Sequence, residues 1–227
     1  MGETKHATAE EACRRRLVVF DFDGTLADTK GSIVRVATGV LREMGVAEER
    51  LVDVPQLVGP PFPQAFMMVF GMSREEADEA TARYRAIYNH MGVEAWPAFT
   101  GIPQLVRDLG ASGRLTAVAS SKSQRMLEKV VGDNGMLADF DAVVGRDVER
   151  ETTKAQAIAG ALARLGVGPA DAVMVGDRCY DVDGAGECGV PCLGVTYGGT
   201  APASELWDSG AVAVAGSVDE LRAMLMG

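Results

Sequence analysis

Long apolar runs are missing from this chain of 227 residues. No window approaches the roughly 20 consecutive apolar residues that a membrane-spanning helix requires. The first 16 residues are polar and charged and contain no apolar segment of the kind found in signal peptides. We therefore expect no contact with a membrane and a cytoplasmic location.

Basic residues are also in short supply. The chain has 22 Lys and Arg against 32 Asp and Glu, which gives a formal net charge of −10. Binding to a nucleic acid polymer needs basic surface, so that class of partner is not expected. A small phosphorylated metabolite stays possible as a substrate, because one bound Mg²⁺ can dominate the local field of a site.

Cysteine and histidine are scarce as well. The four cysteines form no Cys-x-x-Cys pair, and the chain has two histidines, so a zinc site is not expected. Apolar residues make up 47% of the sequence, enough for a sizeable core. The length suits one large domain or one domain with a smaller insert, and it does not indicate an oligomeric state.

An acid pair follows the first apolar run of the chain. Residues 17–20 are typical of a buried strand, and Asp21 and Asp23 come directly after it. Residues two apart in an extended chain point to the same side, so both carboxylates can face one pocket. Their mutual repulsion requires a cation or a shared proton, which indicates a functional site. A polar turn at a strand end is the plainer alternative.

Strands and helices alternate through the second half of the chain. Apolar runs typical of strands occur at residues 115–119, 142–144, 172–175, 192–195 and 211–214. Helical spacing is seen between them, at residues 102–109, 124–134, 153–165, 181–188 and 218–226. This alternation predicts an α/β fold with a parallel sheet covered on both faces. Ligands of such sheets bind at the carboxyl ends of the strands.

Residues 29–99 contain only helical patterns. Helices are expected at residues 32–44, 63–70 and 73–91, the last of them beginning with a capping box of Ser73 and Glu76. A loop is expected at the two prolines of residues 58–61. The segment 96–101 has the composition of a hinge. We therefore predict a core domain of residues 1–28 and 100–227, with an all-helical domain of residues 29–99 inserted in it.

Polar residues recur where the predicted strands end. Ser120 and Ser121 follow the second strand, either as phosphate ligands or as N-caps of the next helix. Lys154 lies in the first turn of a helix, where its charge opposes the helix dipole and needs an explanation. Asp177 and Asp181 are spaced to share one side of a turn. Carboxylates gathered at one edge of the sheet can hold Mg²⁺, and a hydroxyl and a lysine can then bind a phosphoryl group.

This set of residues resembles the four motifs of the haloacid dehalogenase-like (HAD) hydrolase superfamily. The motifs are Asp21-Phe22-Asp23-Gly24-Thr25, Ser120, Lys154 and Gly176-Asp177-Arg178-x-x-Asp181. The resemblance implies a Rossmann-like core with an inserted C1 helical cap. The Val58-Gly59-Pro60-Pro61 loop and Thr100-Gly101 are similar to the phosphoglycolate phosphatase-like branch.

The resemblance also implies an Mg²⁺-dependent phosphatase that forms an aspartyl-phosphate. Asp21 would be the nucleophile and Asp23 the proton donor and acceptor, with a raised pKa, while Ser120 and Lys154 would stabilise the phosphoryl oxygens. The metal would be held by the Asp21 side chain, the backbone carbonyl of Asp23 and Asp177, and Asp181 would orient the metal shell or its waters. Residues expected to contact the substrate are Thr25, Ser121, Gly59, Pro60 and Arg178.

Several other activities compete with this prediction. A dehalogenase has no use for Asp23, and a phosphonatase needs a lysine in the insert, where residues 32–98 contain none. A phosphomutase of the β-phosphoglucomutase type shares the core chemistry and stays open. A phosphoacceptor signalling or binding module also combines acids, a hydroxyl and a lysine, although the Asp-x-Asp spacing and the insert oppose it. The identity of the phosphate ester is left open.

Overall fold

The structure is a computed structural model, and it describes residues 8–147 and 152–227. Six parallel strands form one sheet in the order β3-β2-β1-β4-β5-β6, which confirms the predicted α/β class. The strands are β1 (Leu17–Phe20), β2 (Leu115–Ser123), β3 (Ala142–Arg146), β4 (Ala172–Gly176), β5 (Cys192–Val195) and β6 (Ala213–Ala215). The strand β1, which carries the acid pair, lies in the middle of the sheet.

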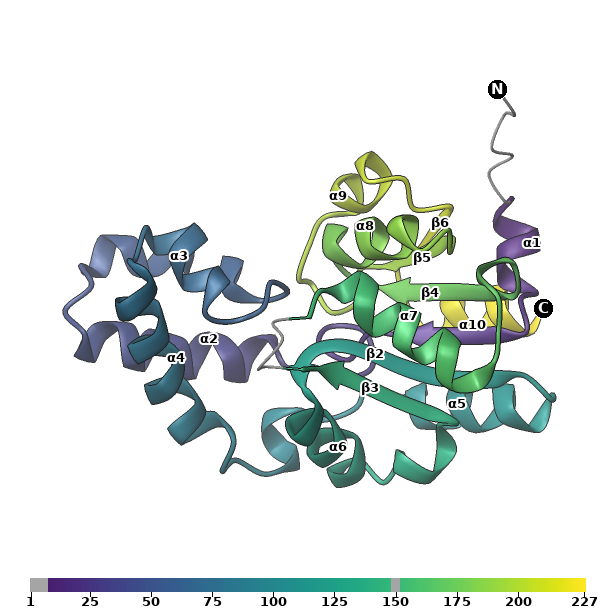
Figure 1. Ribbon diagram of the computed structural model, residues 1–227, viewed down its shortest axis with the longest axis horizontal. Coiled ribbons are helices and arrows are strands. Elements are labelled where there is room, and N and C mark those ends of the chain that lie inside the picture. The colour runs from purple at the N-terminus through teal and green to yellow at the C-terminus, as the bar shows by residue number, and fades with distance from the viewer. Residues whose placement is uncertain (1–7, 148–151) are drawn as a thin grey trace.

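Helices cover both faces of the sheet (Figure 1). On one face Val18 and Phe20 pack in a core with helices α1 (Ala9–Cys13), α5 (Ile102–Ala111), α6 (Gln124–Asp133) and α10 (Val218–Met226). On the other face Leu17 and Val19 pack in a core with α7 (Lys154–Leu165), α8 (Cys179–Glu187) and α9 (Ala203–Asp208). Because every residue of β1 is buried, its sequence is an unbroken apolar run.

Residues 29–99 contain helices and no strand, as predicted. The helices are α2 (Lys30–Glu43), α3 (Gln64–Phe70) and α4 (Arg74–Tyr88), with short 3₁₀ segments at Glu48–Leu57 and Val93–Ala95. Together they form a helical lobe beside the carboxyl ends of the strands (Figure 1). The predicted capping box of α4 is present, since Ser73 Oγ accepts the Glu76 N–H at 3.2 Å and Glu76 accepts that of Ser73 at 2.8 Å.

The two connections between lobe and core run side by side. The Asp28 N–H donates to Pro97 O at 2.9 Å, and the Phe99 N–H donates to Leu26 O at 3.0 Å. The side chain of Asn134 in the core ties the return connection down, because it binds the Ala98 N–H at 2.8 Å and Trp96 O at 3.0 Å. Residues 96–101, predicted as a hinge, are therefore anchored to the core by hydrogen bonds.

The structure corrects three element boundaries and adds two elements. The strand β2 continues through Ser120 and Ser121 to Ser123, so the alternative that these two serines cap the next helix is wrong. The helix expected at 181–188 begins at Cys179, and the last strand begins at Ala213 rather than 211. Helix α9 and the 3₁₀ segment Glu48–Leu57 were not predicted. None of the helices in the described ranges has the length and apolar character needed to cross a membrane.

Candidate active site

Three buried carboxylates meet at the carboxyl ends of β1 and β4. Asp21 directly follows β1, and its N–H donates to Val175 O of the neighbouring β4 at 2.9 Å. Asp177 directly follows β4, and Asp181 lies in the first turn of α8. Carboxylate oxygens of these three residues all lie within 4.8 Å of one another. The structure therefore brings together the three side chains that the motifs assign to a metal.

The turn that carries Asp177 and Asp181 depends on a glycine. The Asp181 carboxylate folds back onto the turn and accepts the N–H groups of Asp177 at 3.2 Å and Arg178 at 3.1 Å. A Cβ at Gly176 would lie 2.3 Å from the Asp181 side chain, too close for any other residue type. The Gly176-Asp177-x-x-x-Asp181 spacing is thus a geometric requirement of the site.

Burial makes this cluster electrostatically costly. Burial raises the pKa of Asp21 to about 6, against the opposing effect of Lys154 and with further increases from Asp181 and Asp23. Burial, Asp181 and Asp21 likewise raise the pKa of Asp177. A divalent cation among these oxygens would relieve the repulsion, and Mg²⁺ favours such oxygen ligands. The donor set therefore fits the predicted Mg²⁺.

Lys154 contacts two of the three acids. Its Nζ lies 2.6 Å from Asp21 Oδ1 and 2.7 Å from Asp181 Oδ1, and it donates to Ala119 O at 3.0 Å. Burial opposes the ammonium charge, but the acids outweigh it and raise the pKa of Lys154. These contacts explain a lysine in the first turn of a helix, where the helix dipole would disfavour it. Thr153 begins that helix as a side-chain cap of the Gln156 N–H.

Asp23 has a different partner from Asp21. Its Oδ1 lies 3.0 Å from Nζ of Lys122, a residue that the sequence reasoning did not assign to the site. Lys122 lies near the end of β2, and its ammonium is 5.0 Å from the ring centroid of Tyr88 on the lobe helix α4. Each acid of the Asp21-x-Asp23 motif is therefore paired with its own lysine.

Two threonines hold Asp177. Thr25 is fully buried and donates from Oγ1 to Asp177 Oδ1 at 3.3 Å, while Thr200 Oγ1 donates to Asp177 Oδ2. The sequence did not indicate this contact of Thr200 with Asp177. A Cβ at Gly24 would lie 2.1 Å from Asp177 Oδ2, and the φ angle of Gly24 is +70°. The glycine of the first motif therefore leaves room for the acid of the fourth.

The other predicted substrate contacts lie in two places. Ser121, Gly59 and Pro60 line a cavity of about 100 Å³ between the helical lobe and the strand ends, together with Asp23 and Lys122. Ser120 is 1% exposed, and its Oγ accepts the Lys122 N–H at 3.4 Å.

Arg178 lies apart from the lining of this cavity. Its Nε lies 2.8 Å from Glu205 Oε1, and its Nη1 donates to Val58 O on the lobe. Arg178 thereby connects the metal turn to the lobe loop, and its predicted contact with substrate stays a prediction.

Comparison with known proteins gives consistent matches. Residues 18–195 match the family model described as haloacid dehalogenase-like hydrolase. The chain is 32% identical to a 5′-nucleotidase of Pseudomonas aeruginosa, over 94% of this chain and 90% of that protein. A solved structure from Clostridium acetobutylicum, described as a predicted phosphatase, superposes with a TM-score of 0.87 at 32% identity, covering 94% of this chain and 99% of that one.

A third relative has a different described activity. The chain is 34% identical to the tyrosine-protein kinase PtkA of Mycobacterium tuberculosis, over 92% of this chain and 72% of that protein. The solved structure of PtkA superposes with a TM-score of 0.76 at 33% identity, covering 93% of this chain and 98% of that one. A similar fold therefore occurs in proteins described as a predicted phosphatase and as a tyrosine kinase, and a similar sequence in a protein named 5′-nucleotidase.

Proposed function

The chain belongs to the haloacid dehalogenase-like hydrolase family, and on that premise we propose that it is an Mg²⁺-dependent phosphatase of small phosphate monoesters. The observation that carries this proposal is the environment of Asp21. Its carboxylate lies at the end of the central strand, within 2.6 Å of Lys154 and beside the acids Asp177 and Asp181. We further propose that residues 1–28 and 100–227 form the core domain and residues 29–99 the cap.

In the first step Asp21 attacks phosphorus. A bond forms between an Asp21 carboxylate oxygen and phosphorus, and the bond from phosphorus to the leaving oxygen breaks. Asp23 donates a proton to that leaving oxygen. Water then attacks the aspartyl-phosphate, Asp23 accepts a proton from the water, and phosphate leaves with Asp21 regenerated.

The remaining residues balance charge. Lys154 contacts Asp21 Oδ1, and its ammonium can also stabilise negative charge on the phosphoryl oxygens. Ser120 lies on the adjacent strand β2 and can donate a hydrogen bond from its hydroxyl. Asp21, Asp177, Asp181 and the carbonyl of Asp23 would hold Mg²⁺, with Thr25 and Thr200 orienting Asp177. Bound Mg²⁺ supplies positive charge at the reacting phosphate.

We further propose that the enzyme is phosphoglycolate phosphatase-like and acts on a free metabolite in the cytoplasm. Its support is the loop of residues 58–61, which brings Gly59 and Pro60 to the cavity next to Asp23. A loop in that place can select the leaving group of the ester.

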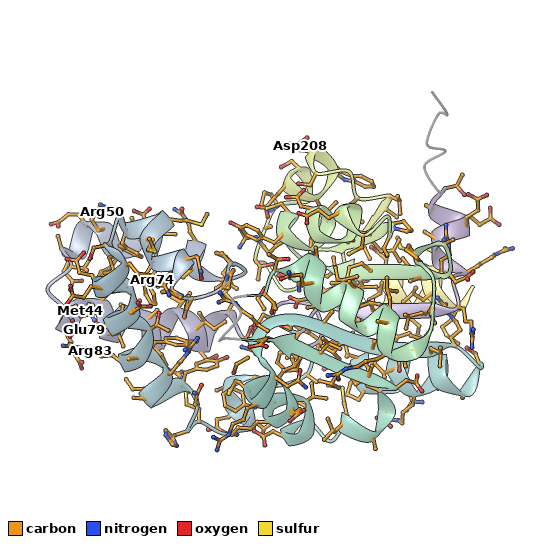
Figure 2. All side chains as sticks on the ribbon, in the orientation of Figure 1. Met44, Arg50, Arg74, Glu79, Arg83 and Asp208 are labelled. Carbon is orange, nitrogen blue, oxygen red and sulfur yellow. The ribbon has the colours of Figure 1, made fainter. Side chains whose placement is uncertain are left out.

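A screen of phosphorylated metabolites with Mg²⁺ tests the proposal, comparing wild type with Asp21→Asn. We expect release of phosphate by wild type, loss in EDTA, and at least about 10³-fold lower kcat for Asp21→Asn, because the nucleophile is removed. Asp208→Asn is the matched control, since Asp208 lies on α9 away from the strand ends (Figure 2). Unchanged turnover in Asp21→Asn would contradict the covalent mechanism.

The same screen separates the competing activities. Isomerisation of a sugar phosphate without release of phosphate would indicate a phosphomutase. Transfer of phosphate from ATP to protein tyrosine would indicate the activity for which PtkA is named. A phosphoprotein that accumulates without turnover would indicate a signalling module.

A further inference from the structure

Two lysines divide the site into two sides. Lys154 contacts Asp21 and Asp181, on the side of the metal and the transferred phosphoryl group. Lys122 contacts Asp23, whose proposed role is to protonate the leaving oxygen. In the proposed mechanism, a cation 3.0 Å from Asp23 would be beside the leaving group, whereas Lys154 would be beside the phosphoryl oxygens.

Lys122 is a largely buried cation at the wall of the cavity. Its side chain is 10% exposed, and it lines the cavity between the helical lobe and the core. An ammonium has three N–H donors, and Asp23 is its one carboxylate partner among residues 8–147 and 152–227. The aromatic face of Tyr88, 5.0 Å away, stabilises the charge without neutralising it. Lys122 thus retains donor capacity for an oxygen atom of a bound molecule.

Cationic side chains gather at the cavity. Its lining in the described structure includes Lys122, Arg85 and Arg146, and one acid, Asp23. Arg85 enters from the lobe helix α4, and Arg146 is at the end of β3, where it donates to Phe62 O at 2.8 Å. Lys122 lies 3.0 Å from Asp23, so an anionic group bound beside Asp23 would meet its ammonium.

The cavity leaves room for a leaving group beside Asp23. Its volume of about 100 Å³ is well above the roughly 10–15 Å³ that one water molecule needs, so Lys122 and Ser121 face space that a bound molecule can occupy.

We propose that Lys122 is a specificity-determining residue that binds an anionic group on the leaving group. The preferred substrates are then small phosphate esters or anhydrides whose leaving group carries a carboxylate or a second phosphate. This inference rests on the proposed phosphatase function and adds the chemistry of the leaving group to it.

The test compares Lys122→Met with wild type on four compounds. 2-Phosphoglycolate has a leaving group with a carboxylate, and inorganic pyrophosphate has one with a phosphate. Ethyl phosphate and p-nitrophenyl phosphate have uncharged substituents. We expect wild type to favour the anionic leaving groups, and Lys122→Met to lower kcat/KM for them by about 10- to 100-fold, mainly through KM. An effect of Lys122→Met through Asp23 acts on all four compounds alike, so the readout is the ratio of kcat/KM between the anionic and the neutral compounds, which we expect to fall.

The neutral compounds isolate recognition from any effect on Asp23. A change at Lys122 that disturbs Asp23 lowers turnover of ethyl phosphate as much as that of 2-phosphoglycolate, and an equal loss for all substrates overturns the proposal. A loss confined to 2-phosphoglycolate or to pyrophosphate supports it and identifies the anion as carboxylate or phosphate. A wild-type enzyme that favours neutral leaving groups also overturns it.

Two variants guard against trivial results. Lys129→Met is the matched control, because Lys129 also lies over an aromatic ring (4.7 Å from Trp96) and pairs with an acid (2.5 Å from Asp133), but away from the cavity. We expect it to leave the substrate preference unchanged. Lys122→Arg keeps the charge and should keep the preference, which provides a folded variant if Lys122→Met is unstable.

The effect of Asp21→Asn on turnover distinguishes a failure of the proposed phosphatase function from a failure of the proposed role of Lys122. If Asp21→Asn abolishes turnover and Lys122→Met has no selective effect, the phosphatase function stands and the role of Lys122 is wrong. If turnover does not depend on Asp21, the proposed function itself is wrong.

Discussion

The position of Asp177 is fixed by two hydroxyl groups, one from each side. Thr25 comes from the turn after β1, and Thr200 comes from the loop after β5. Asp177 is 1% exposed, so these threonines replace the water that would otherwise orient its carboxylate. A metal ligand held in this way does not have to be ordered when the cation binds.

We predict that Thr200→Val weakens Mg²⁺ binding by about 10-fold or more, because groups that orient a metal ligand typically contribute that much to affinity. The substitution preserves shape and removes only the hydroxyl. The measurement is the Mg²⁺ dependence of phosphate release, with the half-saturating concentration as the readout.

Thr196→Val is the matched control for this substitution. Thr196 lies on the same loop, and its Oγ1 contacts Ala215 O at 3.4 Å rather than a carboxylate. We expect its Mg²⁺ dependence to equal that of wild type. An equal shift in both variants would show that the loop as a whole, and not the Asp177 contact, sets the affinity.

The acids that sequence reasoning found stand in short spacings. Asp21 and Asp23 are two apart after a strand, and Asp177 and Asp181 are four apart across a turn, so local geometry predicts that the members of each pair lie at one strand end. Lys122 and Thr200 are paired with acids 99 and 23 positions away, distances along the chain that carry no local signal. Lys122 follows Ser120 at the same strand end, which was the available hint.

At the level of elements, Arg178 links two loops that are distant in sequence. It lies in the turn after β4, pairs with Glu205 of α9 through Nε at 2.8 Å, and donates from Nη1 to Val58 O on the helical lobe. The neighbouring Gly59 has a φ angle of +117°, and a Cβ there would lie 2.9 Å from Arg178 Nη1. The lobe loop is therefore shaped around the guanidinium.

We predict that Arg178→Lys loosens the loop of residues 58–61. A lysine has one nitrogen and cannot contact Glu205 and the Val58 carbonyl with the fork of donors that arginine provides. Hydrogen exchange of the Gly59 amide should become at least about threefold faster, and KM should rise with a smaller change in kcat. Hydrogen exchange with mass spectrometry and steady-state kinetics measure the two effects.

Arg164→Lys is a control with the same chemistry in another place. Arg164 donates to the backbone carbonyl of Val143 at 2.9 Å within the core. Its substitution should leave exchange in residues 58–61 unchanged. If Arg178→Lys changes KM but not exchange in the loop, Arg178 contacts substrate, as the sequence reasoning proposed.

Element boundaries were predicted where side-chain patterns change sharply and missed where they do not. The buried apolar strands and the Ser73 capping box were found because burial and capping leave a direct mark on residue type. The end of β2 was missed because Ser120 to Ser123 are polar, although they continue the strand through an irregular pairing with β3. Helix α9 has six residues and one buried side chain, Leu206, which is too little for a periodic signal.

At the scale of the molecule, the helical lobe and the core enclose the site from two sides (Figure 1). Charged residues such as Arg50, Glu79 and Arg83 lie at the end of the lobe remote from the sheet (Figure 2). Arg83 and Glu79 form an exposed pair four residues apart on α4, a type that contributes little to stability. The acids that affect the stability of the whole fold are the buried ones at the strand ends.

These buried acids predict how stability depends on pH and metal. Burial raises the pKa of Asp21 to about 6, above its ordinary value of 3.8, so the folded metal-free protein binds a proton more tightly than the unfolded chain. The resulting stabilisation is fully present below about pH 4 and is lost as the pH rises through about 6. Mg²⁺ competes with protons for the same carboxylates and stabilises the fold most above that window.

We therefore predict that Mg²⁺ raises Tm more at pH 7.5 than at pH 5. At a concentration about 100 times its Kd, a ligand stabilises the folded state by about 2.7 kcal/mol, which corresponds to roughly 5–10 °C for a protein of this size. Thermal melts in EDTA and in Mg²⁺ at the two pH values give the measurement. Because other acids titrate over this range, the Mg²⁺-dependent change in Tm of wild type is compared with that of Asp177→Asn. We expect Asp177→Asn to lose the Mg²⁺ response and the control Asp208→Asn to keep it. Equal Mg²⁺ shifts at both pH values in the wild type would mean that protons and metal do not compete for this cluster.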